Sequence, residues 1–398
     1  MRILFVTWDG PQVSYLDSLF VPIFAGLAKN GVKVDVLQFR WGDRQIEERS
    51  RQACEAAGLR YRAVNIFRRG GGAGAFLSAA LGARHLRRAV RDFGSDVIMP
   101  RSLMPALVAL TAGGRKLRPI VFDSDGLAAD ERVEVGGLDP TSMTYRILRD
   151  VEAQMVRHSA AILQRTQLSA EILYHRAGPP VTLDMFHVVA NGRDEAVFQP
   201  YDPTLRSEVR RQLGVEASAP LLAYAGSLGP QYGWDTMKEL FQEVRRLRPD
   251  SRLLVLTGTP ERAIQSAEEA PGTVVMSVSP DAVPRFLASA DVGLAYRSTS
   301  YSMQGIAPIK LGEYLLCGLP VIGTAAVGDT RAVVEEGLFF DETAGAEAAA
   351  QWLVGEILPN RDIYREKARK AGKIEFSLSR SIEDYSRALE QLRLPVAR

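Results

Sequence analysis

The chain has 398 residues, of which 46% are hydrophobic and 24% charged, and its formal net charge is +2. This length exceeds what one ordinary core encloses, so two domains are expected. The composition is typical of a globular protein, and no apolar run approaches the roughly 20 residues of a membrane-spanning helix, which argues against an integral membrane protein.

The start of the chain predicts a strand rather than a signal peptide. Residues 3–6 form a short apolar run that ends in polar and turn-forming residues, whereas a signal peptide has a longer apolar segment. We therefore expect a cytoplasmic protein. Its two cysteines, Cys54 and Cys317, lie far apart and lack metal-ligand spacing, so both are interpreted as packing residues in a reducing compartment.

The positive charge is concentrated in one region. Residues 40–118 contain 16 Lys and Arg against 6 Asp and Glu, a balance of +10, which leaves −8 for the remainder of the chain. Two interpretations stay open: attraction to anionic lipid headgroups or a phosphorylated acceptor, or ordinary solvated helix faces. The basic residues that suggest the first are Arg68, Arg69, Arg84, Arg87, Arg88 and Arg91.

In the first half, apolar runs alternate with helical spacing. A strand at residues 3–6, a helix at 18–29 and a strand at 32–39 form a βαβ unit, with Gly31 ending the helix. Further on, the pattern predicts a Gly-rich loop at 70–74, a basic helix at 79–93, strands at 96–99 and 120–122, and a long helix at 144–158.

A turn-rich passage begins at residue 191, and we place a hinge near residues 196–218. A second series follows, with strands at 221–225, 252–257, 274–276, 292–295 and 320–324 and helices at 235–247, 260–269, 281–288 and 310–317. The pattern predicts an α/β protein with two Rossmann-like, doubly wound parallel sheets, in domains at 1–195 and 196–376. An amphipathic helix is expected over about 377–392.

Ligands of open parallel sheets bind beyond the carboxyl ends of the strands. The most informative such stretch is residues 304–324, where Pro308 suits the first turn of a helix whose free N–H groups face an anion such as a diphosphate. Glu313 lies about 7.5 Å further along this helix and could accept hydrogen bonds from a ribose. Lys310 adds a positive charge, the alternative being a solvated helix lysine.

The run Pro308-x-Lys310-Leu-x-Glu313-Tyr-Leu, followed by Val327-Gly328-Asp329, resembles the donor-site signature of glycosyltransferase family 4. The members are retaining enzymes of the GT-B fold, with two facing Rossmann-like domains. Residues 122–126, 188–200 and 290–294 also resemble family segments. The stretch at 377–398 resembles the helix that crosses back to the N-terminal domain.

The resemblance implies roles for individual residues. Glu313 matches the second glutamate of the family's Glu-x7-Glu pair, which holds the donor ribose, while Gly305 stands where the first would fall. The family's phosphate clamp aligns with residues 226–233, which lack its two cations, so we expect Arg297 and Lys310 to replace them. The expected donor-binding residues are Gly226, Ser227, Leu228, Gly258, Ser279, Tyr296, Gln304, Gly305, Ile306, Ala307, Lys310 and Glu313.

The implied reaction transfers a sugar, with retention, from a nucleotide-diphosphate donor to a glycan or lipid-linked saccharide, as in surface polysaccharide or lipopolysaccharide synthesis. Beyond the donor itself we expect no cofactor, no metal and no nucleic acid; peripheral contact with the inner membrane through the basic N-terminal region is one option. The expected catalytic residues are Asp125, Lys310 and Arg297, and Asp9, Gly10, Gln12 and Arg101 are expected on the acceptor side. Asp125 could instead cap a turn, and Asp9 and Arg101 could be ordinary loop and surface residues.

Two other functions stay open. A nucleotide-sugar epimerase would share the fold but needs histidine and acidic groups for proton removal, and a non-catalytic binding protein would explain the lost clamp residues. A dinucleotide-dependent dehydrogenase does not fit, because no Gly-x-Gly-x-x-Gly follows the first strand.

Overall fold

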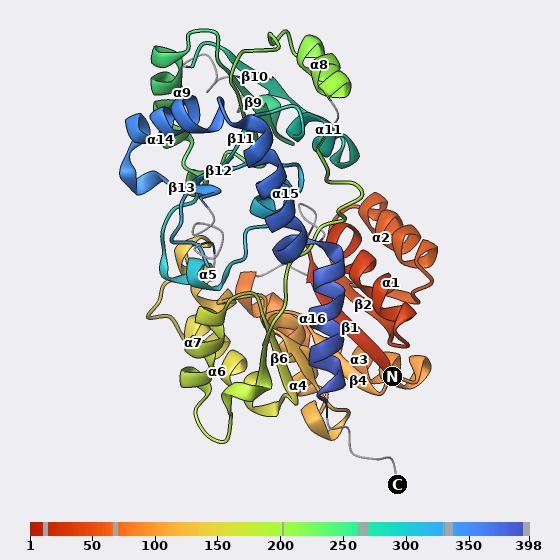
Figure 1. Ribbon diagram of the computed structural model, residues 1–398. Helices are drawn as coiled ribbons and strands as arrows, with labels where there is room; N and C mark the ends of the chain where they lie inside the picture. Colours follow the sequence, from red (N-terminus) through yellow and green to blue (C-terminus); the bar gives the residue numbers. More distant parts are fainter. Residues whose placement is uncertain are drawn as a thin grey trace. The chain divides into compact units, whose positions relative to one another are not determined.

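The structure is a computed structural model that describes residues 1–10, 15–66, 71–200, 203–261, 264, 270–328, 330 and 337–392. The chain divides into two compact units (Figure 1). The first unit comprises Met1–Ala190, Tyr301–Ile306 and Ser381–Arg398, and the second comprises Asn191–Ser300 and Ala307–Arg380. The chain therefore passes from one unit to the other four times.

The first unit contains parallel strands in two ladders, ordered β3-β2-β1-β4 and β5-β6-β7. Parallel bridges from Ile98 to Ile120 and from Arg101 to Asp123 join the edges β4 and β5. Their bounds are β1 Arg2–Asp9, β2 Lys33–Arg40, β3 Tyr61–Asn65, β4 Val97–Pro100, β5 Val121–Asp123, β6 Ala161–Gln164 and β7 Phe186–Val188.

The helices of the first unit include short 3-10 and π segments, labelled η. They are η1 Leu16–Phe20, α1 Val21–Lys29, α2 Arg44–Ala56, α3 Gly71–Phe93, α4 Leu103–Thr111, η2 Gly114–Lys116, α5 Ala128–Glu134, α6 Met143–His158, α7 Gln167–Ala177, η3 Leu183–Met185 and η6 Tyr301–Gly305. The Gly-rich loop expected at 70–74 is wrong, since α3 already begins at Gly71. The residues that follow include alanines at 75, 79, 80 and 83. Alanine is a strong helix former, so the helix begins eight residues before the predicted start at 79.

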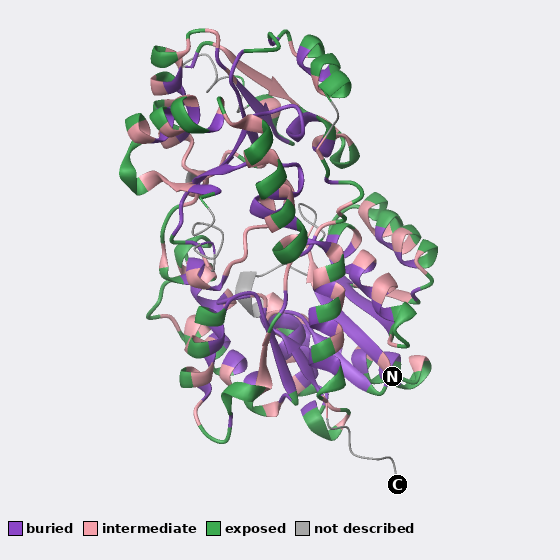
Figure 2. Ribbon diagram, in the orientation of Figure 1, coloured by how far each residue is buried: buried purple, intermediate pink, exposed green. Residues whose placement is uncertain are grey.

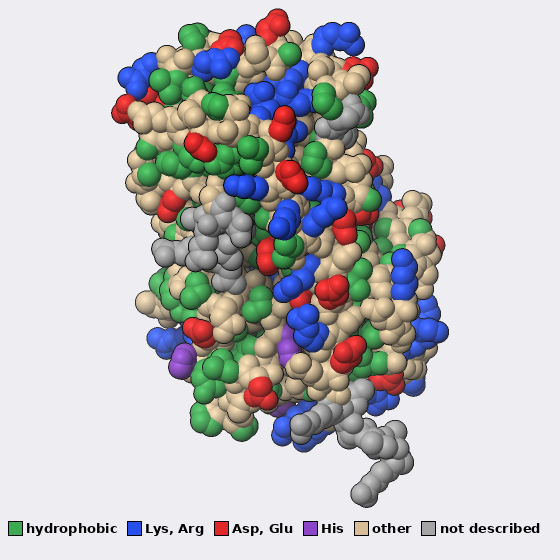
Figure 3. Space-filling model, viewed as in Figure 1, with side chains coloured by type: hydrophobic (Ala, Val, Ile, Leu, Met, Phe, Trp, Pro, Cys, Tyr) green, Lys and Arg blue, Asp and Glu red, His purple; other side chains and the backbone are tan. Residues whose placement is uncertain are grey.

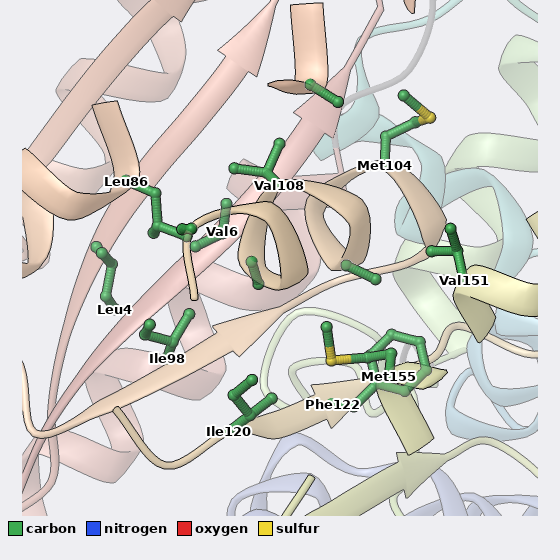
Figure 4. Close-up of a cluster of buried hydrophobic side chains, with 14 of the residues drawn as sticks. Leu4, Val6, Leu86, Ile98, Met104, Val108, Ile120, Phe122, Val151 and Met155 are labelled. Carbon is green, nitrogen blue, oxygen red and sulfur yellow. The ribbon is translucent and has the colours of Figure 1, made fainter. Parts of the chain in front are cut away.

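The core of the first unit lies between the strands and their helices. Figure 4 shows Leu4 and Val6 from β1, Ile98 from β4, and Met155 from α6 in one buried cluster. The strands β4, β5 and β6 and most of β1 and β2 are buried (Figure 2), as expected where helices cover both faces of a parallel sheet. Cys54 is buried in this unit, as predicted.

The final helix, α16 Leu378–Glu390, completes the first unit from Ser381 onward. Ile382 packs so closely on Gly26 of α1 that a Cβ at residue 26 would lie 2.1 Å from Ile382 Cδ1. Asn30 Nδ2 also donates a hydrogen bond to Ser386 Oγ, at 3.1 Å. The expected return of the last helix to the N-terminal half is confirmed.

The second unit is a six-stranded parallel sheet, ordered β10-β9-β8-β11-β12-β13. The strands are β8 Leu221–Ala225, β9 Arg252–Leu256, β10 Thr273–Met276, β11 Val292–Ala295, β12 Val321–Gly323 and β13 Phe339–Asp341. The helices are α8 Pro203–Gln212, η4 Pro230–Tyr232, α9 Trp234–Leu247, η5 Pro280–Ala282, α11 Val283–Leu287, α12 Ile309–Leu316, η7 Glu342–Ala344, α14 Ala346–Trp352, η8 Leu353–Ile357 and α15 Arg361–Phe376.

Two clusters of apolar side chains cover the two faces of this sheet, and Cys317 is buried in one of them. The helix expected at 260–269 falls largely outside the described residues, as does Asp329. Within the described part of the chain, none of the helices combines the length and apolar character needed to cross a bilayer.

Candidate functional site

In the second unit, Lys310 lies at the carboxyl end of β8. Its Nζ donates a hydrogen bond to Tyr224 Oη at 2.9 Å and lies 4.2 Å and 4.5 Å from the ring centroids of Tyr224 and Tyr232. Gly226 makes this approach possible, because a Cβ there would lie 2.3 Å from Nζ. Two residues that the sequence singled out, Gly226 and Lys310, are thus brought into contact.

Arg297 supplies a second cation at the same end of the sheet. Its guanidinium lies 5.4 Å from the ring centroid of Tyr232, so Tyr232 is shared by Arg297 and Lys310. The backbone N–H of Arg297 donates to Thr324 Oγ1 at 3.0 Å, which ties the end of β11 to the end of β12. Burial, reinforced by the charge of Arg297, lowers the pKa of Lys310 to about 7.

Ser227 and Leu228 belong to the turn after β8. The Ser227 carbonyl accepts a hydrogen bond from Tyr224 Oη, and Leu228 packs partly against the apolar cluster under α9. Tyr296 is buried in the same cluster and Gly233 approaches it closely. We refer to Lys310, Arg297 and Tyr232 as the basic site; it therefore lies beside a cluster of buried apolar side chains.

Glu313 lies one turn after Lys310 on α12, but it is already ion-paired. Its Oε1 lies 2.9 Å from Arg193 Nε, and its side chain is only 13% exposed. Burial raises the pKa of Glu313, while Arg193 and Lys310 oppose that shift. Arg193 was missed as a site residue, because nothing in its local sequence relates it to a helix more than a hundred positions later.

Other expected donor residues lie further from Lys310 or in the other unit. Gly258 follows β9 and Ser279 follows β10. These strands are the first and second neighbours of β8 in the sheet, so their axes lie about 5 Å and 10 Å from it. Ala307 belongs to the second unit, where its carbonyl accepts a hydrogen bond from Asn191 Nδ2 at 3.3 Å. Gln304, Gly305 and Ile306 group with the first unit.

The segment Tyr301–Ile306 is held tightly within the first unit. The Glu134 carboxylate accepts hydrogen bonds from the backbone N–H groups of Tyr301 and Ser302, at 2.8 Å and 2.9 Å, and Thr166 Oγ1 donates to the Gln304 carbonyl at 2.6 Å. Gly305 lies directly against the backbone of Gly126. The N–H of Ile306, expected to face an anion, instead donates to the carbonyl of Met303 at 3.2 Å.

A pocket of about 210 Å³ opens in the first unit at the carboxyl ends of β1, β4 and β5. It brings together the expected residues Asp9, Gly10, Arg101 and Asp125, whereas Gln12 lies outside the described residues. The rest of its lining is Thr7, Trp8, Tyr15, Ser102, Met104, Pro105 and Arg132. Aromatic rings beside hydroxyl and carboxylate groups are chemistry suited to a sugar.

Arg101 organises one wall of this pocket. Its Nη2 lies 2.6 Å from Asp125 Oδ1 and its Nη1 lies 3.3 Å from Asp123 Oδ2, while its guanidinium lies 4.4 Å from the ring centroid of Phe20. Asp125 has φ +59°, a left-handed conformation that Asp tolerates better than most residues. Burial raises the pKa of Asp125, against the opposing charge of Arg101.

Behind this wall lies a buried ion pair that was not predicted. Arg165 Nη2 lies 2.8 Å from each carboxylate oxygen of Asp123, and Tyr385 Oη from α16 lies 3.4 Å from Asp123 Oδ2. The Asp123 carboxylate is therefore occupied by Arg165 and Tyr385, which indicates a structural role. Among the described residues no group of three or more His, Cys, Asp or Glu could hold a metal ion.

Asp9, the last residue of β1, also lines the pocket. Its Oδ2 accepts hydrogen bonds from Gln38 Nε2 at 2.7 Å and from Thr7 Oγ1 at 3.0 Å. Burial raises the pKa of Asp9, while these hydrogen bonds act against the shift. Asp9 is therefore an oriented carboxylate at a strand end rather than a loose loop cap.

The basic region at 40–118 is partly neutralised. Arg60 pairs with Asp35, Arg62 with Asp92, and Arg40 with Glu47, while Arg68 and Arg69 lie outside the described residues. On α3, exposed Leu77 and Leu81 continue at helical spacing into the exposed side chains of Arg84, Arg88 and Arg91. The Nε atoms of Arg88 and Arg91 each lie 3.5 Å from a carboxylate oxygen of Asp92. We refer to these two leucines and three arginines as the exposed stripe of α3; it is apolar where it begins and basic where it ends.

Two family models match the chain: "Glycosyl transferase 4-like domain" over residues 21–192 and "Glycosyl transferases group 1" over residues 219–355. Among curated proteins, the chain is similar to D-inositol 3-phosphate glycosyltransferases. It is 28% identical to that of Segniliparus rotundus over 55% of this chain and 48% of the relative, and 34% identical to that of Xylanimonas cellulosilytica over 46% and 44%. The chain thus spans about half the length of these curated relatives.

Among solved structures, the crystal structure of Anabaena Alr3699/HepE in complex with UDP is similar over 98% of this chain and 100% of that chain. The TM-score is 0.74 at 16% sequence identity. This likeness, together with the parallel sheets of both units, confirms the GT-B fold that the sequence predicted.

Proposed function

Given that the chain belongs to the group 1 glycosyltransferases of family 4 type, we propose that it transfers a sugar from a nucleoside-diphosphate donor to a hydroxyl of a glycan or lipid-linked saccharide. The observation that carries this proposal is the pair of cations, Lys310 and Arg297, that both contact the ring of Tyr232 at the carboxyl ends of β8 and β11. A diphosphate is the ligand that such a pair fits best.

In this proposal Lys310 and Arg297 stabilise the negative charge that gathers on the departing diphosphate. They replace the clamp cations that the family has in the turn after the first strand of this domain. Lys310 reaches the same place from α12 because Gly226 leaves room for its Nζ. Glu313 supports the site in two ways. It pairs with Arg193, and its negative charge raises the pKa of Lys310, which favours the charged amine.

We propose that the pocket of the first unit receives the acceptor. Asp125 contacts the reacting sugar or the acceptor hydroxyl, Arg101 orients Asp125, and Asp9 accepts a hydrogen bond from a second hydroxyl. The support is that these three side chains line one pocket and that Arg101 lies 2.6 Å from Asp125. Retention without a protein base, and without a metal, follows the family resemblance and is part of the proposal.

An epimerase is less well supported. It needs a histidine among its reactive groups, and no histidine is among the residues that line the pocket of the first unit. His158 is instead hydrogen-bonded to the carbonyl of Gln154, within α6.

We further propose that the protein works at the cytoplasmic face of the inner membrane. The support is the exposed stripe of α3, whose leucines and arginines suit the interface of an anionic bilayer. A flotation assay with phosphatidylglycerol vesicles tests this, and binding that survives Arg84, Arg88 and Arg91 all changed to Gln would contradict it.

The decisive experiment titrates UDP and other nucleoside diphosphates into the full chain and then measures sugar transfer from the matching donor. We expect Lys310→Met to weaken binding by about tenfold or more, since a charged hydrogen bond contributes about 1.5–3 kcal/mol. The matched control is Lys373→Met, an exposed lysine of α15. Equal loss in both variants, or none in either, would remove Lys310 from the donor site.

A further inference from the structure

Three arginines of the second unit pair with one buried aspartate, and a fourth binds the carbonyl of the residue before it. Asp291 Oδ1 lies 2.5 Å from Arg206 Nη2 and 2.7 Å from Arg361 Nε, and its Oδ2 lies 3.0 Å from Arg210 Nη2. Arg365 donates to the carbonyl of Ala290 at 2.6 Å, directly beside Asp291 in the chain. We refer to Arg206, Arg210, Arg361 and Arg365 as the arginine cluster.

The cluster carries more positive charge than its surroundings neutralise. Asp291 supplies one negative charge and also accepts a hydrogen bond from the N–H of Leu221. Asp362 adds a weaker attraction, toward Arg365. Burial, together with repulsion from the neighbouring arginines, lowers the pKa of Arg206 to about 10, which is unusual for a guanidinium.

The cluster has a buried floor and an accessible rim. The side chains of Arg210 and Asp291 are 1% and 0% exposed, whereas those of Arg206 and Arg361 are 13% and 26% exposed. Within the described residues, the Nε groups of Arg206 and Arg210 have no hydrogen-bond acceptor. Figure 3 shows basic side chains gathered on the visible surface of the second unit near the start of α15, the helix that carries Arg361 and Arg365.

The cluster is separate from the basic site of Lys310 and Arg297. Asp291 immediately precedes β11, whereas Arg297 follows its carboxyl end. The four residues of β11 put about 13 Å between the two positions. A ligand at the arginine cluster would therefore not compete with one held by Lys310.

We propose that the arginine cluster binds a phosphate group, held by the guanidiniums of Arg206 and Arg361 at its rim. The planar guanidinium fork matches the spacing of phosphate oxygens, and a doubly charged oxyanion would offset most of the charge that Asp291 leaves unbalanced. The phosphate is either free inorganic phosphate, largely a dianion near neutral pH, or the singly charged phosphodiester of an anionic lipid headgroup, since both present unesterified anionic oxygens on phosphorus.

The test uses thermal unfolding of the full chain at pH 7.5, with sodium phosphate replacing sodium chloride at constant ionic strength. UDP is present throughout, so that phosphate does not report on Lys310. We expect a saturable rise in the unfolding temperature of about 3 °C, as for a ligand at about ten times its dissociation constant. In the variant carrying both Arg206→Gln and Arg361→Gln, we expect less than a third of that rise.

The matched control is Arg246→Gln, an exposed arginine of α9 that pairs with Glu243; it should respond like the unchanged protein. If the double variant does not fold, Arg361→Gln alone decides, because its side chain is the more exposed of the two. An equal response to phosphate in the unchanged protein and in these variants overturns the proposal and leaves the cluster with a purely structural role.

The source of the phosphate is separated by sedimentation with vesicles of phosphatidylglycerol or phosphatidylcholine. Both the reference chain and the variant here carry Arg84→Gln, Arg88→Gln and Arg91→Gln, so that α3 does not contribute to the binding. Binding to phosphatidylglycerol that is lost with Arg206→Gln and Arg361→Gln assigns a lipid headgroup. A response to inorganic phosphate without such vesicle binding assigns the free ion. Neither outcome depends on sugar transfer, so this inference can fail while the proposed transfer reaction holds, and the reverse.

Discussion

Lys310 is surrounded by tyrosine rings and by Arg297, and the effects of burial and of Arg297 on its pKa outweigh the opposing charge of Glu313. With its pKa near 7 in the folded chain and about 10.4 when unfolded, the unfolded chain binds more protons between these values. The free energy of unfolding therefore rises with pH across this window. Anion binding has the opposite dependence, because it requires the protonated amine.

We accordingly expect the affinity for UDP to fall as the pH rises from 7 to 9, by up to about tenfold per pH unit. Calorimetric titration at several pH values measures this slope. Lys310→Met should bind more weakly and show a flat profile over the same range. A profile with the same slope in Lys310→Met would assign the titration to another group.

Asp125 combines an unusual backbone with a charged contact to Arg101. Asn tolerates the same left-handed conformation, so Asp125→Asn removes the charge while keeping the turn. We expect sugar transfer to fall by about tenfold or more, with UDP affinity and far-ultraviolet circular dichroism unchanged. The control is Asp139→Asn, in an exposed turn of the same unit. A parallel loss of UDP affinity would place Asp125 with the donor instead.

Among the elements, the segment Tyr301–Ile306 explains a departure from the family pattern. The family has a glutamate where this chain has Gly305, and a Cβ on Gly305 would lie 2.8 Å from Leu127 N and 2.9 Å from Gly126 Cα. Backbone atoms cannot move aside as a flexible side chain can. The first glutamate of the pair is therefore incompatible with this packing, whatever its value for binding.

We predict that Gly305→Ala lowers the free energy of unfolding by about 1–3 kcal/mol, the usual effect of overpacking. Gly305→Glu should be at least as destabilising and should not improve UDP binding. Chemical denaturation measures both. The control is Gly355→Ala, at an exposed position of η8 where a Cβ meets nothing within 4 Å. If Gly305→Ala proves as stable as this control, the close packing on Gly126 is wrong.

The sequence predicts most of the strands and misses four. β8 and β11 lie where their uninterrupted apolar runs indicate, and α12 differs by one residue at each end. Three of the missed strands, β3, β7 and β13, lie at sheet edges, whereas the fourth, β6, lies between β5 and β7 and is only four residues long. Edge strands are short and only partly buried, so β3 carries Arg62 and Asn65 and shows no apolar run.

The sequence likewise predicts some residues of the candidate site and misses others. Lys310 and Gly226 could be found because both lie in loops or helix starts at strand ends, a position that the order of elements defines. The partners of the charged residues could not, because Glu313 pairs with Arg193 and Asp123 with Arg165 through the tertiary fold. No local spacing encodes such contacts.

Taken as a whole, the protein depends on its last helix for the integrity of the first unit. Tyr385 and Ile382 of α16 contact Asp123 and Gly26, which are 97 positions apart in the chain. We predict that deleting residues 381–398 abolishes the cooperative unfolding of the first unit while the sheet of the second unit persists. Hydrogen exchange resolved by segment measures this, and intact protection of β1 and β5 in the shortened chain would contradict it.

The division of the first unit into three separate stretches of chain also governs how the protein can assemble during translation. Its seven strands are synthesised before residue 190, but η6 arrives only after residue 300 and α16 only after residue 380. The second unit must therefore emerge from the ribosome while the first still exposes the surfaces that those late pieces cover. Until α16 has been synthesised, the nascent first unit lacks the helix that packs against Gly26 and Asp123.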